Sequence, residues 1–283
     1  MRKRVWQGAV GARRQFGRAT APLRPVPEFV IVGAQRAGTT SLHRYLLNHP
    51  GVLGAGLMKG VHWFDESFDQ PSSWYRAHFP TTFHRYRISR RIGFQPVTGE
   101  ASPYYLFHPH VAGRMATAVP DARIIAVLRD PVERAWSHYQ HNVARGMEPL
   151  AFADALAAEP GRLAGAEARL LRPGYVDLAH RRGSYVARGR YSEQLERLWS
   201  VFPSDQLLVL FSDDLDREPG LTVGRVHTFL GLPVLPPATA RRWNQQPPAQ
   251  LPAGTRDELE SAFAGPDRLL AARLGRKLPW GRS

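Results

Sequence analysis

A glycine-rich turn near the start of the chain carries groups well suited to binding an anion. Residues 33–40 follow the apolar run 29–32 directly and keep the glycine spacing of a phosphate-binding loop. A turn of this kind aims several backbone N–H groups at one point, and the helix that follows adds about half a positive charge there. A nucleoside triphosphatase carries lysine where this chain has Thr39, which argues against chemistry at a γ-phosphate. The cation lies instead inside the loop, at Arg36.

A second candidate anion site follows the apolar segment 123–128. Arg129 stands at the end of this expected strand, and Ser137 stands eight residues later, two turns into an expected helix. Both side chains can therefore approach one anionic group from the same side. A guanidinium offers paired donors to a phosphate, and a hydroxyl adds one more. The alternative is that Arg129 pairs with a nearby carboxylate and Ser137 is a small packing residue, and the spacing alone leaves both open.

The third group contains Lys59 and His62, with Glu100 expected as a neighbour. A lysine, a histidine and a carboxylate beside a phosphate loop can stabilise developing charge and accept a proton. The competing interpretation is that His62, which stands between Val61 and Trp63, is a satisfied residue of the core. The local sequence by itself favours that plainer interpretation.

The elements expected to position these groups alternate between strands and helices. Short apolar runs predict strands at residues 29–32, 52–53, 97–100, 123–128 and 206–211. Helical patterns separate them, most clearly at residues 39–48, 131–145, 188–202 and 221–230. This alternation predicts an α/β fold with a P-loop NTPase-like parallel sheet of about five strands and helices on both faces. In such a sheet ligands bind beyond the carboxyl ends of the strands, where the three loops are expected to meet.

Composition predicts one globular domain preceded by a basic arm. The chain has 283 residues, of which 43% are hydrophobic and 22% charged, and no cysteine, which excludes disulfides and thiolate metal sites. Residues 1–27 hold seven arginines and lysines and no acid, so subtracting them from the formal charge of +14 leaves +7. That remainder suits a polyanionic ligand, or equally serves solubility. We expect residues 1–27 to be a disordered arm and residues 28–283 to form the domain.

The arm and the apolar segments also predict where the protein works. No run approaches the ~20 apolar residues of a membrane span, and the arm lacks the apolar centre of a signal peptide. We therefore expect a cytoplasmic protein that binds no nucleic acid. The arm is expected to be solvated, with a weak contact to an anionic membrane surface or to nucleic acid as the alternatives. The oligomeric state is left open.

Taken together, these segments resemble the sulfotransferases that use 3′-phosphoadenosine 5′-phosphosulfate (PAPS), especially the heparan-sulfate type and its bacterial relatives. The resemblance runs in order through residues 35–42, 99–106, 128–139, 190–197, 202–211 and 274–280. The joint occurrence of these motifs is far more specific than any one of them. It covers the chain from residue 28 to residue 280.

The resemblance implies transfer of a sulfuryl group from PAPS to a hydroxyl or amine of a small-molecule or glycan acceptor, such as a saccharide or glycolipid, without a metal. It implies that the 3′-phosphate is held by Arg129 and Ser137. It also implies that the 5′-phosphosulfate is held by Arg36, Ala37, Gly38, Thr39, Thr40 and Ser41. The family commonly has lysine at the position of Arg36. A phosphosulfate has no γ-phosphate, which accounts for the missing loop lysine.

The acceptor side departs from the family pattern. Heparan-type enzymes often have a glutamate, proposed as general base, where this chain has Gly60. His62 is therefore our first candidate for the base and Glu100 the second, while Lys59 and Arg36 are expected to neutralise developing charge.

Other parts of the chain are expected to complete the site, and two other classes of protein stay open. Segments 148–190 and 233–252 are expected to shape the acceptor site, and Trp243 and Asn244 are a further candidate contact to the nucleotide. The alternatives are a P-loop kinase or nucleotide hydrolase, and a protein that holds an adenine nucleotide or polyanion without chemistry.

Overall fold

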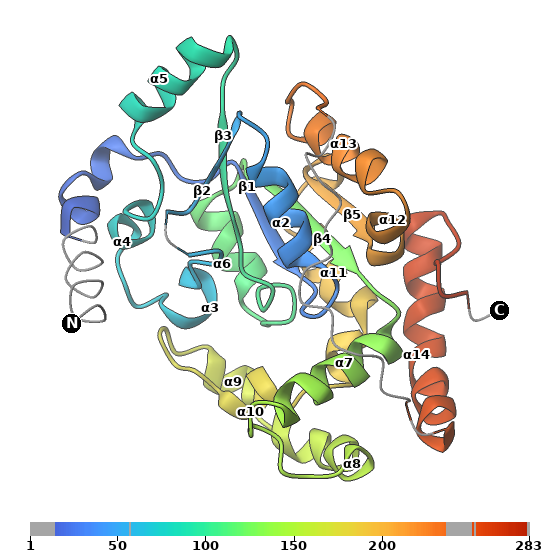
Figure 1. The fold of residues 1–283 in the computed structure, drawn as a ribbon. Helices are drawn as coiled ribbons and strands as arrows, with labels where there is room; N and C mark the ends of the chain where they lie inside the picture. The colour runs from blue at the N-terminus through green and yellow to red at the C-terminus, as the bar shows by residue number, and fades with distance from the viewer. Residues whose placement is uncertain (1–14, 57, 236–250, 252, 282–283) are drawn as a thin grey trace.

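Five short apolar segments form a parallel sheet at the centre of the molecule. The computed structural model describes residues 15–56, 58–235, 251 and 253–281. The strands are β1 (Phe29–Gly33), β2 (Val52–Gly54), β3 (Val97–Ala101), β4 (Arg123–Leu128) and β5 (Leu207–Phe211). Every neighbouring pair is parallel, in the order β2-β3-β1-β4-β5. The predicted α/β fold with a five-stranded parallel sheet is confirmed (Figure 1).

The strand order changes direction beside β1, and this change decides where a ligand site forms. From β1 the chain moves outward to β2, returns to β3, and then crosses to β4 and β5 on the other side. The loops that follow β1 and β4 therefore leave the sheet on opposite faces, at the switch point where sheets of this kind bind ligands. These two loops carry Arg36 and Arg129.

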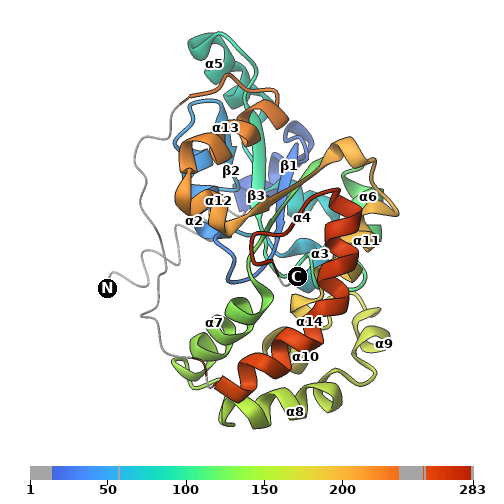
Figure 2. The same cartoon turned by 90° about the vertical axis from the view of Figure 1, so that its right-hand side faces the viewer.

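Helices cover both faces of the sheet (Figures 1 and 2). One face is covered by α2 (Thr39–Leu47), α12 (Ser212–Arg217) and α13 (Pro219–Phe229). The other is covered by α6 (Val111–Ala118), α11 (Tyr191–Trp199) and α14 (Ala253–Leu274). The predicted helix at 188–202 begins at Tyr191, because residues 187–189 form the short 3-10 helix η2 (Ala187–Gly189).

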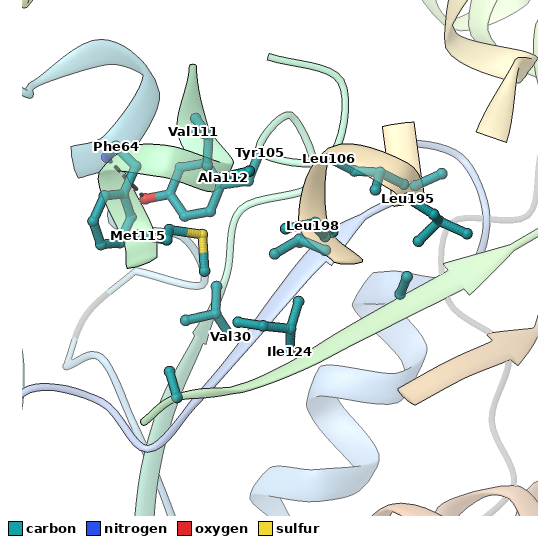
Figure 3. Close-up of a cluster of buried hydrophobic side chains, with 14 of the residues drawn as sticks. Val30, Phe64, Tyr105, Leu106, Val111, Ala112, Met115, Ile124, Leu195 and Leu198 are labelled. Carbon is teal, nitrogen blue, oxygen red and sulfur yellow. Dashed lines mark hydrogen bonds between the residues drawn. The ribbon is translucent and has the colours of Figure 1, made fainter. Parts of the chain in front are cut away.

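Alternate residues of the central strands build the two cores, because successive side chains of a strand point to opposite faces. Val30 and Ile124 pack with Met115 of α6 and with the apolar side of α11 (Figure 3). Ile31 and Ile125 pack on the other face against α2 and α13. The strands are therefore apolar on both sides, as their uninterrupted hydrophobic runs predicted.

A group of short helices lies beyond the carboxyl ends of the strands (Figure 1). It consists of α7 (Pro131–Val143), α8 (Phe152–Leu163), α9 (Ala166–Leu170) and α10 (Leu178–Arg182). Helix α7 begins where predicted: Pro131 takes the first helical position, and the Asp130 carboxylate accepts a hydrogen bond from the backbone N–H of Val132 at 2.9 Å. It starts directly after β4, and so it places its first two turns beside the switch point.

Four further elements lie toward the β2 edge of the sheet: η1 (Ala21–Leu23), α3 (Trp63–Glu66), α4 (Ser72–Arg76) and α5 (Thr82–Ile92). At the opposite edge, η3 (Ser204–Gln206) leads into β5. Part of the segment predicted to be disordered is folded toward the β2 edge. Ala21 is buried and Val26 packs against the core, so apolar burial orders residues 15–27. Residues 1–14, and Trp243 with Asn244, lie outside the described residues. No helix within the described part is long and apolar enough to cross a membrane.

Candidate cofactor and acceptor site

The loop after β1 presents an uncapped helix N-terminus. Gly38 takes a left-handed φ of 93° at the N-cap of α2, and no side chain caps the helix there. Arg36 also has a positive φ, of 71°. The first N–H groups of α2 have no partner within their own helix and point along its axis, an arrangement that favours an anion. Thr39 and Ser41 are buried beside this turn, and Thr40 is half-buried.

Lys59 brings a second cation to the loop from a distant segment. Its ammonium donates hydrogen bonds to Oγ1 of Thr39 at 3.1 Å and Oγ1 of Thr40 at 2.9 Å. Burial, and to a lesser extent the charge of Arg44, lowers the pKa of Lys59 to about 8. The structure therefore joins the predicted first and third groups, and Lys59 occupies the region where a P-loop lysine would act.

Arg36 and Ser137, predicted in separate groups, are in direct contact. The Arg36 Nε donates to Ser137 Oγ at 3.0 Å, and its Nη1 lies 3.5 Å from Nδ1 of His141. Burial lowers the pKa of Arg36, and the nearby charge of Arg129 lowers it further. A bound anion would favour the charged guanidinium and oppose both effects.

Arg129 completes this cationic region. Its Nη1 lies 3.4 Å from the carbonyl oxygen of Arg36, and Tyr191 Oη donates to the Arg129 carbonyl at 3.0 Å. The carboxylate contact that the sequence left open exists, but it is long: Arg129 Nη2 is 3.9 Å from Glu133, whose other oxygen pairs with Arg256 at 2.7 Å. The Arg129 side chain is 34% exposed, so a ligand can reach it.

His62 is held by a carboxylate rather than buried as a plain core residue. Its Nδ1 lies 2.8 Å from Oδ2 of Asp65, one α-helical turn later, and 3.5 Å from Oε1 of Glu66. Because an ionised carboxylate can only accept, Nδ1 carries a proton, and the neutral form of the ring has its lone pair on Nε2. The His62 side chain is 27% exposed, and its φ of 54° fixes it at the start of α3.

The space beside Gly60 excludes any side chain. A Cβ placed on Gly60 would lie 2.7 Å from the carbonyl oxygen of Ala101, 2.7 Å from Oγ of Ser102 and 3.2 Å from Nε2 of His62. A glutamate at this position is therefore incompatible with this backbone. The imidazole of His62 borders the space instead.

Glu100 lies in the interior, where it organises the site without reaching the solvent. It is completely buried, and its Oε2 accepts from the Val61 N–H at 2.7 Å and from Ser102 Oγ at 2.7 Å. Its Oε1 accepts from the hydroxyls of Tyr75 at 2.8 Å and Tyr105 at 3.1 Å. Burial raises the pKa of Glu100, and the hydrogen bonds oppose that rise. Glu100 thus holds the segment that carries Lys59 and His62 through its contact with the Val61 N–H, whereas His62 is partly exposed.

Tyr105 couples the same segment to the core. Its hydroxyl also lies 2.9 Å from the backbone N of Trp63 and 3.4 Å from that of Phe64, the contact drawn as a dashed line in Figure 3. The start of α3 is therefore tied to the loop that follows β3.

Two arginines that sequence reasoning missed connect the helices beyond the strands to the site. Arg188 is buried, donates to the side chain of Gln35, and lies 4.9 Å from the ring centroid of Tyr104. Burial lowers its pKa to about 9. Arg181 of α10 forms an ion pair with Glu66 beside His62. The available signal was their position at the end of segment 148–190, which was expected to shape the acceptor site.

The fold and the loop together define an α/β protein that binds an anionic ligand at the switch point of a parallel sheet. More specifically, the chain belongs to the sulfotransferase family, whose model matches residues 27–237. This match does not favour the two alternatives, a P-loop kinase or nucleotide hydrolase and a binding protein that catalyses no reaction.

Relatives with known names support the same family. Human bifunctional heparan sulfate N-deacetylase/N-sulfotransferase 2 is 32% identical over 224 residues, which cover 73% of this chain and 22% of that protein. Mouse heparan sulfate glucosamine 3-O-sulfotransferase 6 is 32% identical over 211 residues, which cover 74% of this chain and 53% of that protein. The chain therefore spans only part of the length of either relative.

A solved structure matches over nearly the whole fold. The crystal structure of a sulfotransferase from Alicyclobacillus acidocaldarius aligns with a TM-score of 0.69 and 31% identity. The alignment covers 92% of this chain and 100% of that chain. The likeness thus extends beyond the phosphate loop to the elements that surround it.

Proposed function

We propose that this protein transfers a sulfuryl group from PAPS to a hydroxyl or amine of a saccharide or glycolipid acceptor. Family membership supports the reaction class, and two relatives named for heparan sulfate support a saccharide. The observation that carries the proposal is the convergence of Lys59, Arg36 and Arg129 around an uncapped helix N-terminus. PAPS has two separate anionic ends, and these cations reach the loop from different segments of the fold.

The loop and the start of α7 divide the binding of the donor between them. Residues 36–41 hold the 5′-phosphosulfate with backbone N–H groups, two threonine hydroxyls and the cations of Arg36 and Lys59. Arg129 and Ser137 hold the 3′-phosphate. Each charge-assisted hydrogen bond to a phosphate is worth about 1.5–3 kcal/mol, so each contact has a measurable effect on affinity.

His62 accepts the proton of the acceptor. Asp65 keeps Nδ1 protonated and the ring oriented, so that Nε2, which borders the space beside Gly60, carries the lone pair of the neutral ring. The proton leaves the acceptor oxygen for Nε2 as that oxygen forms its bond. Glu100, with both oxygens already hydrogen-bonded in the interior, holds the segment in place and does not take this proton.

PAPS, when bound, supplies the sulfuryl group, whose bond to a 5′-phosphate oxygen breaks as the bond to the acceptor oxygen forms. Lys59 and Arg36 stabilise the negative charge that develops on the oxygen left behind. Lys59 is held by the loop hydroxyl of Thr40 and Arg36 by Ser137 of α7 before the donor arrives, which reduces the reorganisation needed during the reaction. We propose that these groups act without a metal. A cytoplasmic location stays a prediction.

The direct test is transfer of label from [35S]PAPS by the purified full chain to a panel of acceptors. The panel contains N-sulfated and N-unsubstituted heparosan oligosaccharides, simple glycolipids and small alcohols. The proposal expects label in at least one saccharide or glycolipid. Tight binding of 3′-phosphoadenosine 5′-phosphate (PAP) with no transfer to any acceptor in the panel would support a binding protein, and magnesium-dependent ATP turnover would support a kinase or hydrolase.

A further inference from the structure

Helix α5 forms a basic surface that projects from the rest of the fold. It lies beyond the amino ends of the strands, at the opposite end of the molecule from α7 to α10 (Figures 1 and 2). None of its eleven residues is buried. The helix contains a histidine and four arginines and no acid.

The inner side of α5 accounts for its attachment. Arg85 forms an ion pair with Glu28 and donates to the carbonyl of Pro96 at 2.8 Å. Ile88 and Ile92 are partly buried on the same side of the helix. These contacts use one arginine and the isoleucines, and they leave the opposite side of α5 to the solvent.

The outer side of α5 combines cations with exposed rings. Phe83, Tyr86, Arg87 and Arg90 follow the i, i+3, i+4, i+7 spacing of a single helix face. Phe83 is 70% exposed and Tyr86 is 58% exposed. Within the described part of the chain, neither Arg87 nor Arg90 has an acidic partner. This face therefore presents positive charge and apolar area together.

The same surface continues into the residues ahead of β1. Thr82 Oγ1 donates to the carbonyl of Leu23 at 3.0 Å, and Leu23 is itself 62% exposed. Phe16 is also 62% exposed, with the Arg24 guanidinium 5.8 Å from its ring centroid. Residues 1–14, which precede this segment in the sequence, hold five arginines and lysines and no acid.

We propose that α5 and residues 16–23 form a peripheral docking surface for an anionic lipid bilayer. Arginines near a membrane surface are attracted to anionic headgroups, and aromatic rings beside them enter the boundary between headgroups and acyl chains. A soluble polyanion would satisfy the arginines but leave Phe83 in water. A second copy of the chain, paired through this face about a two-fold axis, would bring like charges together.

Docking through α5 sets the orientation of the site. The phosphate loop lies at the carboxyl ends of the strands and α5 beyond their amino ends, so the loop faces away from the bilayer (Figure 1). This orientation suits a soluble saccharide acceptor, which would approach from the aqueous side, rather than a glycolipid of the same bilayer. This surface is separate from the residues proposed for catalysis, so its test does not depend on sulfuryl transfer.

The experiment is flotation of the full chain with vesicles of phosphatidylcholine alone or mixed with phosphatidylserine. We expect binding to the mixed vesicles, lost at high salt, and little binding to phosphatidylcholine. Changing Phe83→Ser together with Arg87→Glu should lower partition into mixed vesicles about tenfold or more, because two units of charge and one inserted ring are lost. The thermal midpoint should stay unchanged, since both side chains are exposed.

The matched control is Arg268→Glu with Leu269→Ser on α14, which changes the charge equally and removes an apolar residue that is 66% exposed. This pair should leave vesicle binding intact. Unchanged binding of the α5 pair would overturn the proposal. Failure of the wild-type chain to bind mixed vesicles would also overturn it. In that case, loss of binding to a sulfated polysaccharide or DNA in the α5 pair would indicate a soluble polyanion as the partner, and a changed oligomeric state would indicate a second copy of the chain.

Discussion

The ammonium of Lys59 lies 2.9 Å from Oγ1 of Thr40, nineteen positions earlier in the chain, and so brings a second cation to a loop that already carries Arg36. The same ammonium donates to Thr39, the residue that stands where a P-loop carries lysine. Thr39 thus accepts a hydrogen bond from Lys59, the lysine that takes the place of the P-loop lysine. The charge at the loop is kept, but its source is the segment that also carries His62.

Lys59 should make donor binding depend on pH. Its pKa of about 8 in the free protein means that it is charged below that pH and must take up a proton to bind an anion above it. Affinity for PAP should therefore fall as the pH rises through about 8, by up to about tenfold per unit. Lys59→Arg should remove this fall because arginine stays charged, and Lys59→Met should weaken binding about tenfold or more at neutral pH.

Isothermal titration calorimetry with PAP between about pH 7 and pH 9.5 measures this effect. The PAP phosphates are already almost fully ionised over most of this range, so the Lys59→Met titration corrects for their remaining contribution. A wild-type pH dependence that persists in Lys59→Met would show that another group causes it.

Gly60 should tolerate no side chain. A Cβ there meets the carbonyl oxygen of Ala101 at 2.7 Å, so Gly60→Ala must displace backbone and should cost about 1–3 kcal/mol of unfolding free energy. It should also lower kcat at least about tenfold, because His62 moves with the segment. Gly60→Glu should not create a working base.

The control for Gly60 is Gly113→Ala on α6, where a Cβ meets nothing within 4 Å. That change should stabilise the helix by about 0.5–1 kcal/mol and leave turnover unchanged. Chemical denaturation measures the unfolding free energy, and steady-state kinetics measures kcat, for the Gly60 and Gly113 variants. Higher turnover in Gly60→Glu than in the wild type would mean that the segment can rearrange to accept a carboxylate.

His62 and Asp65 should differ in how they affect turnover. His62→Ala should lower kcat about 10²- to 10⁴-fold with little change in PAP affinity, since it removes the proton acceptor only. Asp65→Asn should lower kcat less, because the imidazole remains but its orientation and tautomer are no longer fixed. His84→Ala, at an exposed histidine of α5, is the control for both.

Single-turnover kinetics and PAP titration separate these effects. Glu100→Gln should act through stability, because it leaves buried donors without a charged acceptor. Wild-type turnover in His62→Ala with normal PAP binding would remove His62 from the proposed mechanism.

Arg129 should report on the 3′-phosphate alone. Arg129→Ala should weaken PAP binding about ten- to a hundredfold, and Ser137→Ala by less, since one charge-assisted contact is lost in each case. Both variants should weaken the binding of adenosine 5′-phosphosulfate less than they weaken the binding of PAP, because adenosine 5′-phosphosulfate lacks the 3′-phosphate. Equal losses for both ligands would place Arg129 at the 5′-phosphate that they share instead.

The control for Arg129 is Arg225→Ala, an exposed arginine on α13, which should leave both affinities unchanged. The comparison needs both ligands for every variant. For each variant, the change in binding free energy for PAP is then compared with the change for adenosine 5′-phosphosulfate, and a loss confined to PAP indicates a contact with the 3′-phosphate.

The fold could be predicted because its signals are local. The apolar runs of β1, β4 and β5 are uninterrupted over four or more residues and are too short for typical helices, which is typical of strands buried on both faces. Pro131 after Asp130 marked the start of α7 to the residue. Burial in residues 15–27 escaped prediction because the apolar residues there are few and widely spaced, and only their neighbours reveal that they are covered.

The acceptor side could be predicted only in part. The sequence indicated that Lys59, His62 and Glu100 belong together, but it could not assign their roles. A glutamate reads the same in the sequence whether its carboxylate is buried in the core or exposed in an open site. Burial and four hydrogen-bond donors separate Glu100 from the solvent. The contribution of Arg181 and Arg188 depends on how α10 and η2 fold back beyond the strands, and no local pattern specifies that.

The sequence by itself determined that a glycine loop without its lysine leads from a buried strand into a helix, and that Gly60 leaves no carboxylate at the expected position. Only the tertiary structure decided that Lys59 places a cation beside Thr39 and Thr40 and that His62 borders the space beside Gly60. The physical reason is distance. The identity of a side chain limits the chemistry it can do, but whether it meets a ligand, a partner or the core depends on which segments the sheet brings within a few ångströms.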